Sequence, residues 1–123
     1  MKLLLDTHVL LWWLADDPTL SPVHRSAIAD PANVVYVSSA SAWEISIKRA
    51  LGKLVAPEDL TGALMESELE QLPITVAHAE AVGALPMHHR DPFDRMLIAQ
   101  AQIEGLTMVT GDPVFGRYDV ASL

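Results

Sequence analysis

A chain of 123 residues, half of them hydrophobic and 20% charged, has the size and composition of one globular domain spanning residues 1–123, and is not disordered. It has no cysteine, which excludes disulfide bonds and thiolate metal sites, and a cytoplasmic location is the default expectation. No apolar run reaches the ~20 residues that span a bilayer, so we expect no membrane partner. The net charge of −8 argues against a basic nucleic-acid surface, unless several acids share one pocket with divalent cations.

The first third of the chain predicts two strands and two helices. Residues 2–5 are expected to form a short apolar strand and residues 7–15 a helix. The leucine-rich start resembles a signal peptide, but Asp6 and His8 interrupt its apolar run. Ser21 followed by a proline favours a second helix over residues 22–29, and residues 34–37 form the second strand.

The middle of the chain predicts a third helix, capped by Ser39 or Ser41, with apolar residues at helical spacing at positions 43, 47, 51 and 54. Further along, we expect a helix over residues 57–72, a weaker third strand over 73–76 and a short helix over 77–85.

The last third predicts a strong helix over residues 91–104, ended by Gly105, and a fourth strand over 106–109, with 120–123 as a candidate fifth. Alternating strands and helices predict an α/β fold with a central, mostly parallel sheet of about five strands, flanked by helices. In such sheets ligands bind beyond the carboxyl ends of the strands, near the point where the strand order reverses.

Two acids in the first half of the chain are candidate site residues, and each also has a purely structural explanation. Asp6 directly follows the first strand, where an aspartate commonly starts a turn or caps a helix. Glu44 lies four residues before Lys48, in the favourable order for an ion pair on the surface of a helix. Neither acid identifies a site by itself.

Two acids in the second half are equally ambiguous. Asp94 lies in the first turn of the helix that Asp91 and Pro92 begin, where the helix dipole stabilises a negative charge. Asp112 belongs to a Gly-Asp-Pro sequence, which is also a common turn. Helix formation does not explain why basic residues gather around Asp94. This cluster, which would suit a site for a phosphate and its metal, consists of His88, His89, Arg90 and Arg95.

The combination is more specific than its parts, because all four acids fall at one edge of a parallel sheet. Two unit charges about 4 Å apart repel by about 4 kcal/mol at an effective dielectric constant of ~20, so four carboxylates need cations or protons. Oxygen ligands alone favour Mg²⁺ or Mn²⁺ over zinc. Such ions suit the displacement of a phosphodiester by activated water.

Four segments, LLLDTHVLLWWL, SSASAWEISIK, HRDPFDRMLIAQA and MVTGDPVF, occur in this order over nearly the whole chain. With them the sequence resembles PIN domains, and specifically the VapC toxins of type II toxin–antitoxin systems. The resemblance implies a PIN-like fold and endonucleolytic cleavage of RNA in a pocket that binds Mg²⁺ or Mn²⁺. The catalytic and metal-binding residues carried over are Asp6, Glu44, Asp94 and Asp112.

The same resemblance implies roles for neighbouring residues. Asp91 is a fifth acid in this set, either a ligand or only a helix cap, and its spacing favours the cap, with Asp94 pointing at the metal. The hydroxyls of Thr7 and Thr110 are expected to hold waters or a carboxylate. Family members commonly have Ser or Asn soon after the first aspartate, where this chain has Thr7 and His8, so His8 is assigned no catalytic role. His88 and His89 remain open to two interpretations, contact with an RNA phosphate or simple solvation.

The resemblance also implies a homodimer and a cognate antitoxin, through which alone the protein would reach DNA. A long apolar stretch gives this mild support, although it is equally explained as ordinary core: Leu51, Leu54, Val55, Leu60, Leu64 and Met65. No basic recognition helix occurs in the chain.

Two other functions compete with this hypothesis. A phosphoacceptor receiver domain would need adjacent acids after the first strand and a lysine near the last one, whereas Asp6 stands alone and no lysine follows Lys53. A PIN-like module that binds RNA or protein without catalysis is the remaining alternative, and the presence of all four acids argues against it.

Overall fold

The computed structural model describes residues 1–123, which form an α/β fold around one parallel sheet. The strands are β1 (Lys2–Leu5), β2 (Val34–Ser38), β3 (Glu70–Leu72) and β4 (Thr107–Val109), in the order β3-β2-β1-β4. All three pairings are parallel, and Leu3 of β1 lies opposite Val35 of β2 and Thr107 of β4. The predicted α/β fold and its parallel sheet are therefore confirmed.

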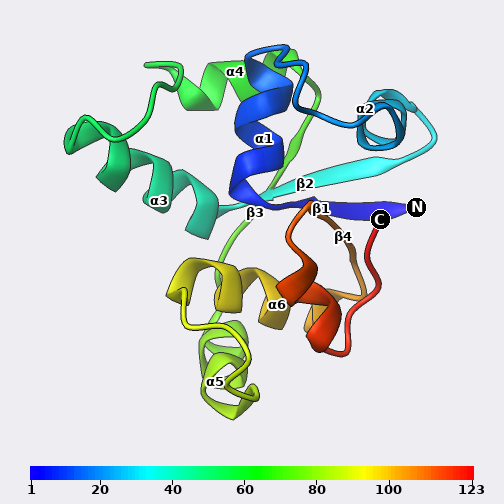
Figure 1. Ribbon diagram of the computed structural model, residues 1–123, viewed down its shortest axis with the longest axis vertical. Coiled ribbons are helices and arrows are strands. Elements are labelled where there is room, and N and C mark those ends of the chain that lie inside the picture. Colours follow the sequence, from blue (N-terminus) through cyan, green and yellow to red (C-terminus); the bar gives the residue numbers. More distant parts are fainter.

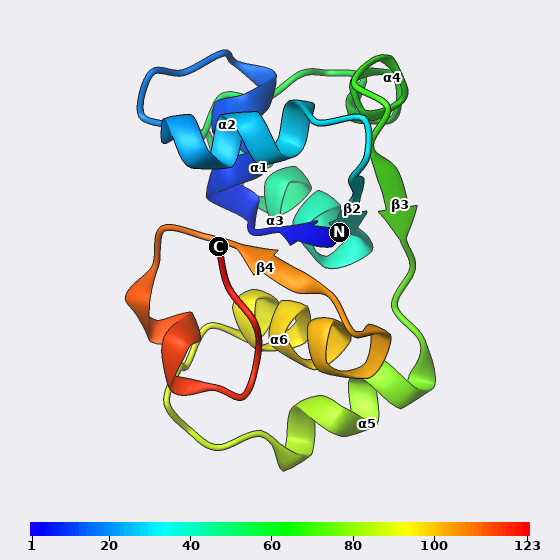
Figure 2. The same ribbon diagram turned by 90° about the vertical axis from the view of Figure 1, so that its right-hand side faces the viewer.

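Helices cover both faces of this sheet (Figures 1 and 2). One side carries α1 (Thr7–Leu14), α2 (Pro22–Ala29), α3 (Ser39–Ala50) and α4 (Leu60–Glu66), and the other carries α5 (Val76–Ala84), α6 (Pro92–Glu104) and the 3-10 helix η1 (Pro113–Arg117). None of the helices is both long enough and apolar enough to span a membrane.

The alternation of side chains along β1 divides the core into two layers. Leu3 and Leu5 pack toward α1 and its neighbours, whereas Leu4 packs on the opposite face among α6 and the C-terminal residues. All three leucines are fully buried, as expected for a central strand covered on both faces. The short apolar run before Asp6 is therefore a central strand of the sheet, and it places that acid at the sheet edge.

Several predicted boundaries are wrong. The third strand is Glu70–Leu72 rather than 73–76, and Pro73, which lacks an N–H group for a sheet ladder, directly follows it. The helix expected over 57–72 is only Leu60–Glu66, and Ser38, not Ser39 or Ser41, caps α3. Of the fifth strand there is a single bridge between Met108 and Ser122.

The chain order of the strands creates a switch point at β1. The chain runs outward from β1 through β2 to β3, and then crosses back to place β4 on the other side of β1. The carboxyl ends of β1 and β4 therefore lie side by side where the strand order reverses, the usual place for a ligand site in a sheet of this type.

Candidate functional site

Asp6 lies at the end of β1 and is almost completely buried, with 5% of its surface exposed. Its Oδ1 atom accepts a hydrogen bond from the backbone N–H of Val9 at 2.8 Å, so it caps α1. Its Oδ2 atom accepts from the Thr110 hydroxyl at 2.5 Å, across from the end of β4. Burial raises the pKa of Asp6, although both hydrogen bonds lower it. Asp6 is thus a helix cap and a costly buried acid at once.

Glu44 is buried on α3, with 3% of its surface exposed. Its Oε1 atom accepts from the Thr7 hydroxyl at 2.7 Å and its Oε2 atom from the Lys48 ammonium at 2.6 Å. The predicted ion pair therefore exists, but its acid faces the interior rather than solvent. The hydrogen bond to Glu44 raises the pKa of Lys48, and the negative charges of Glu44, Asp91 and Asp94 add to this effect.

Asp91 and Asp94 have separate roles at the start of α6. The Oδ1 atom of Asp91 accepts from the backbone N–H groups of Phe93 at 2.8 Å and Asp94 at 3.1 Å, which makes Asp91 the N-cap. The Asp94 side chain makes no such bond. Burial, followed by the charge of Asp91, raises its pKa to about 6, although His89 lowers it. Asp91 is therefore the helix cap, as predicted, and the Asp94 carboxylate takes no part in capping.

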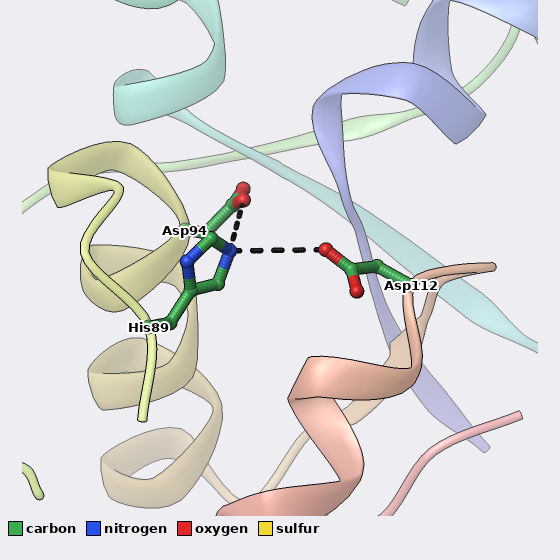
Figure 3. Close-up of side chains that lie close together, drawn as sticks. All are labelled: His89, Asp94 and Asp112. Atoms are coloured by element: carbon green, nitrogen blue, oxygen red, sulfur yellow. Dashed lines mark hydrogen bonds and ion pairs between the residues drawn. The ribbon is translucent and has the colours of Figure 1, made fainter. Parts of the chain in front are cut away.

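Asp112 and His89 complete the group around Asp94 (Figure 3). The Nε2 atom of His89 lies 2.9 Å from Oδ2 of Asp94 and 3.8 Å from Oδ2 of Asp112, so one ring nitrogen points toward both carboxylates. The Oδ1 atom of Asp112 accepts from the backbone N–H of Val114 at 3.0 Å. Asp112 therefore caps η1 with one oxygen and turns the other toward His89.

The four predicted acids reach one edge of the sheet, but they do not form one compact cluster. Ligand atoms of His89, Asp94 and Asp112 lie within 4.8 Å of one another, and Asp6 and Glu44 are outside this group. They remain close enough to interact, because the charge of Asp112 raises the pKa of Asp6 and that of Glu44 raises the pKa of Asp94. An open cleft of about 310 Å³ lies between Asp6 and Asp112 and is also lined by His8, Trp12 and Gly111, whereas Glu44, His89 and Asp94 do not line it.

The family model for the PIN domain matches residues 3–121. The chain belongs to the PIN-domain family. No protein with a curated description matches the sequence.

Among solved structures, the fold is similar to a chain of VapBC2 from Rickettsia felis bound to a promoter DNA fragment, with a TM-score of 0.73 and 19% identity over 100% of this chain and 98% of that one. It is also similar to a chain of DNA-bound VapBC from Salmonella typhimurium, with a TM-score of 0.72, 20% identity and coverages of 100% and 97%. A chain of FitAcB from Neisseria gonorrhoeae gives a TM-score of 0.65 and 21% identity, with coverages of 98% and 96%. The resemblance to VapC-like toxins is confirmed at the level of the fold.

The donor set of this PIN domain fits a hard divalent cation. Carboxylates from four chain segments approach one sheet edge, and burial raises the pKa of two of them, Asp6 and Asp94, so a cation beside these two would offset the cost of their ionisation. The predicted hydroxyl partners are in place, since Thr7 donates to Glu44 and Thr110 donates to Asp6. Oxygen ligands of this kind suit Mg²⁺ or Mn²⁺.

Arg95 does not face the acids, which corrects the prediction that it belongs to a phosphate site. Its buried guanidinium donates to the carbonyl oxygens of four residues in the segment before α6, at 2.9–3.4 Å: Val82, Leu85, Pro86 and His89. The Tyr118 hydroxyl accepts hydrogen bonds from the backbone N–H groups of His88, at 3.1 Å, and His89, at 2.8 Å. These two buried side chains fix the segment that carries His89, a role that sequence reasoning missed.

The apolar stretch proposed as a partner surface is divided. Leu64 is buried and belongs to the core, whereas Leu51, Met65 and especially Val55, at 96% exposure, lie on the surface. Trp43, adjacent to Glu44, is also exposed and packs edge-on against Phe93 at a centroid distance of 5.3 Å.

Proposed function

We propose that this PIN domain, over residues 1–123, is an Mg²⁺- or Mn²⁺-dependent endoribonuclease and the toxin of a type II toxin–antitoxin pair. The observation that supports this best is the convergence of Asp6, Glu44, Asp94 and Asp112 at the switch point of the sheet, where ionised acids are unfavourable without a cation. The substrate is RNA, and the reaction is hydrolysis of a phosphodiester bond.

The mechanism assigns a task to each acid. Asp94 and Asp112 each direct their Oδ2 atom toward His89, while the Oδ1 atom of Asp94 makes no hydrogen bond. These two carboxylates would hold the ion. Asp6 and Glu44, oriented by threonine hydroxyls, add negative charge to the same pocket from its buried side. When bound, the ion supplies activation of water and stabilisation of the negative charge that develops on the phosphate.

The partners follow from the similar complexes and from the exposed apolar side chains. The solved relatives are VapBC and FitAB assemblies, several of them bound to DNA. We infer a cognate antitoxin, which would carry the contact with DNA, and a homodimer in which residues such as Trp43 and Leu51 are covered. The site of action would be the cytoplasm, where RNA is available.

Cleavage assays on a set of structured RNAs test the proposal with wild type, Asp6→Asn and the control Asp119→Asn. Asparagine keeps an oxygen to cap α1, so loss of folding is not expected, whereas removal of the negative charge of Asp6 from the metal pocket should lower the rate by at least about 10²-fold. Asp119 is exposed and its side chain makes no hydrogen bond, so its variant should cleave like wild type. Equal metal-dependent activity in Asp6→Asn and wild type would refute the assignment. RNA binding without cleavage by the wild type would favour the non-catalytic module.

A further inference from the structure

We propose that His89 is a positioning residue, which holds Asp94 through an Nε2–H donor and is not itself a metal ligand. The inference rests on the proposed function only in treating Asp94 as a ligand of the ion. It concerns the chemical class of the metal site, because a histidine beside two carboxylates resembles in composition a zinc site of the catalytic type.

The tautomer of His89 follows from its two hydrogen bonds. Its Nδ1 atom lies 3.3 Å from the backbone nitrogen of Asp91 and accepts a hydrogen bond from that N–H group. Accepting requires a lone pair at Nδ1. In a neutral imidazole one nitrogen accepts and the other donates, so the proton lies on Nε2. This Nε2–H group points at Oδ2 of Asp94, 2.9 Å away, which is an acceptor when ionised.

Ligation of a metal would reverse this arrangement. Nε2 would need its lone pair for the ion, so the proton would move to Nδ1 and face the N–H of Asp91. Both present hydrogen bonds of the ring would then be lost. Asp91 is itself the N-cap of α6, so its N–H cannot turn away without disturbing the start of that helix.

The orientation of the His89 ring is supported by hydrogen bonds of its backbone to buried groups and by packing of the ring itself. The N–H of His89 donates to the Tyr118 hydroxyl at 2.8 Å, and its carbonyl oxygen accepts from the Arg95 guanidinium at 3.3 Å. The ring also packs edge-on against Phe115 at a centroid distance of 6.2 Å. His89 is therefore supported from the core, unlike a mobile surface histidine.

The consequence for Asp94 is a carboxylate with two different oxygens. Oδ2 is occupied by His89, whereas Oδ1 makes no hydrogen bond and is available to an ion. Because His89 uses its Nε2–H as a donor to Asp94, the ligands that remain for the ion are all oxygen atoms. The site should therefore prefer Mg²⁺ or Mn²⁺, even though a histidine is within reach.

Variants of His89 separate a donor from a ligand. Glutamine can present an amide N–H near the place of Nε2, whereas leucine has no donor, and His88→Gln is the matched control on the neighbouring residue. Mn²⁺ binding, followed by electron paramagnetic resonance, should change less than about threefold in His89→Gln and His88→Gln and weaken by about 10- to 100-fold in His89→Leu. Circular dichroism and thermal unfolding check that each variant folds. Equal losses in the glutamine and leucine variants, or no binding of Mn²⁺ by wild type, would overturn the proposal.

Nitrogen-15 NMR of the ring gives a second test that needs no variant. In wild type loaded with Mg²⁺, the proton of His89 should remain on Nε2, with Nδ1 unprotonated. A proton on Nδ1 together with loss of the proton from Nε2 would show ligation through Nε2 and overturn the inference, and protons on both nitrogens would overturn the assigned tautomer. Neither measurement uses RNA, so a protein that binds Mn²⁺ as expected but cleaves no RNA would refute the proposed function and leave this inference standing.

Discussion

Asparagine at position 94 should stabilise the metal-free protein and abolish its metal-dependent activity. The pKa of Asp94 is raised from its ordinary 3.8 to about 6, chiefly by burial and then by the charge of Asp91. At pH 7 the folded protein therefore holds an ionised group that it disfavours, at a cost of about 3 kcal/mol. Asparagine has the same shape without the charge, and its oxygen can still accept from His89.

The stability difference between Asp94→Asn and wild type should depend on pH. Because the pKa of Asp94 is higher in the folded than in the unfolded protein, its favourable contribution is fully present below about pH 4 and is lost as the pH rises through about 6. The advantage of Asp94→Asn over wild type should therefore approach 3 kcal/mol at pH 7 and fall below about 1 kcal/mol at pH 4.

Thermal unfolding in EDTA measures this difference, which corresponds to roughly 10 °C in Tm at pH 7 for a chain of this length. Asp119→Asn, which removes an exposed acid, should behave like wild type at both pH values. Added Mn²⁺ should raise the Tm of wild type and leave that of Asp94→Asn unchanged. The reasoning fails if Asp94→Asn is no more stable than wild type at pH 7 in EDTA.

Three further substitutions test the groups that support the acids. Thr110→Val removes the hydroxyl bound to Asp6, so the free energy of unfolding should fall by about 1–3 kcal/mol and Mn²⁺ binding, measured by calorimetry, should weaken at least tenfold. Arg95→Lys cannot reach all the carbonyl oxygens that the guanidinium serves, and urea titration should show a loss of about 2–4 kcal/mol, no smaller than for Arg95→Met. Lys48→Met leaves the buried Glu44 without its cation, so Tm in EDTA should fall while the rise on adding Mg²⁺ exceeds that of wild type; Lys48→Arg should restore both.

Elements with a local sequence signal, the apolar strands β1, β2 and β4 among them, were predictable from sequence, whereas β3, which depends on its pairing alone, was not. Helix α2 begins at Pro22, after the N-cap Ser21, as expected, and α6 ends before Gly105, which adopts the left-handed conformation with φ of 67°. Strand β3 has the polar sequence Glu70-Gln71-Leu72, without an apolar pattern. It is a strand because it pairs with the edge of β2, and that contact is invisible in the local sequence.

The acids were predictable because topology brings them together, whereas their cationic neighbours depend on finer contacts. His89 and Arg95 belong to the same short segment, and the sequence gives both an equal claim to the site. In the fold, Arg95 turns inward to backbone carbonyls and His89 turns toward Asp94. Tyr118, far along the chain, supports this arrangement, because its hydroxyl accepts hydrogen bonds from the His88 N–H and from the Arg95 guanidinium.

The structural and functional explanations of the acids are compatible because a carboxylate has two oxygens. Asp6 and Asp112 each cap a helix with Oδ1 and leave Oδ2 for another partner. Asp91, in contrast, uses Oδ1 for two N–H groups of α6 and remains a cap. Helix N-termini also carry partial positive charge, which offsets part of the repulsion among acids gathered at one sheet edge. A site assembled from acids at helix caps and on helices is therefore indistinguishable from ordinary capping and ion pairing in any one segment, and only the convergence of the segments reveals it.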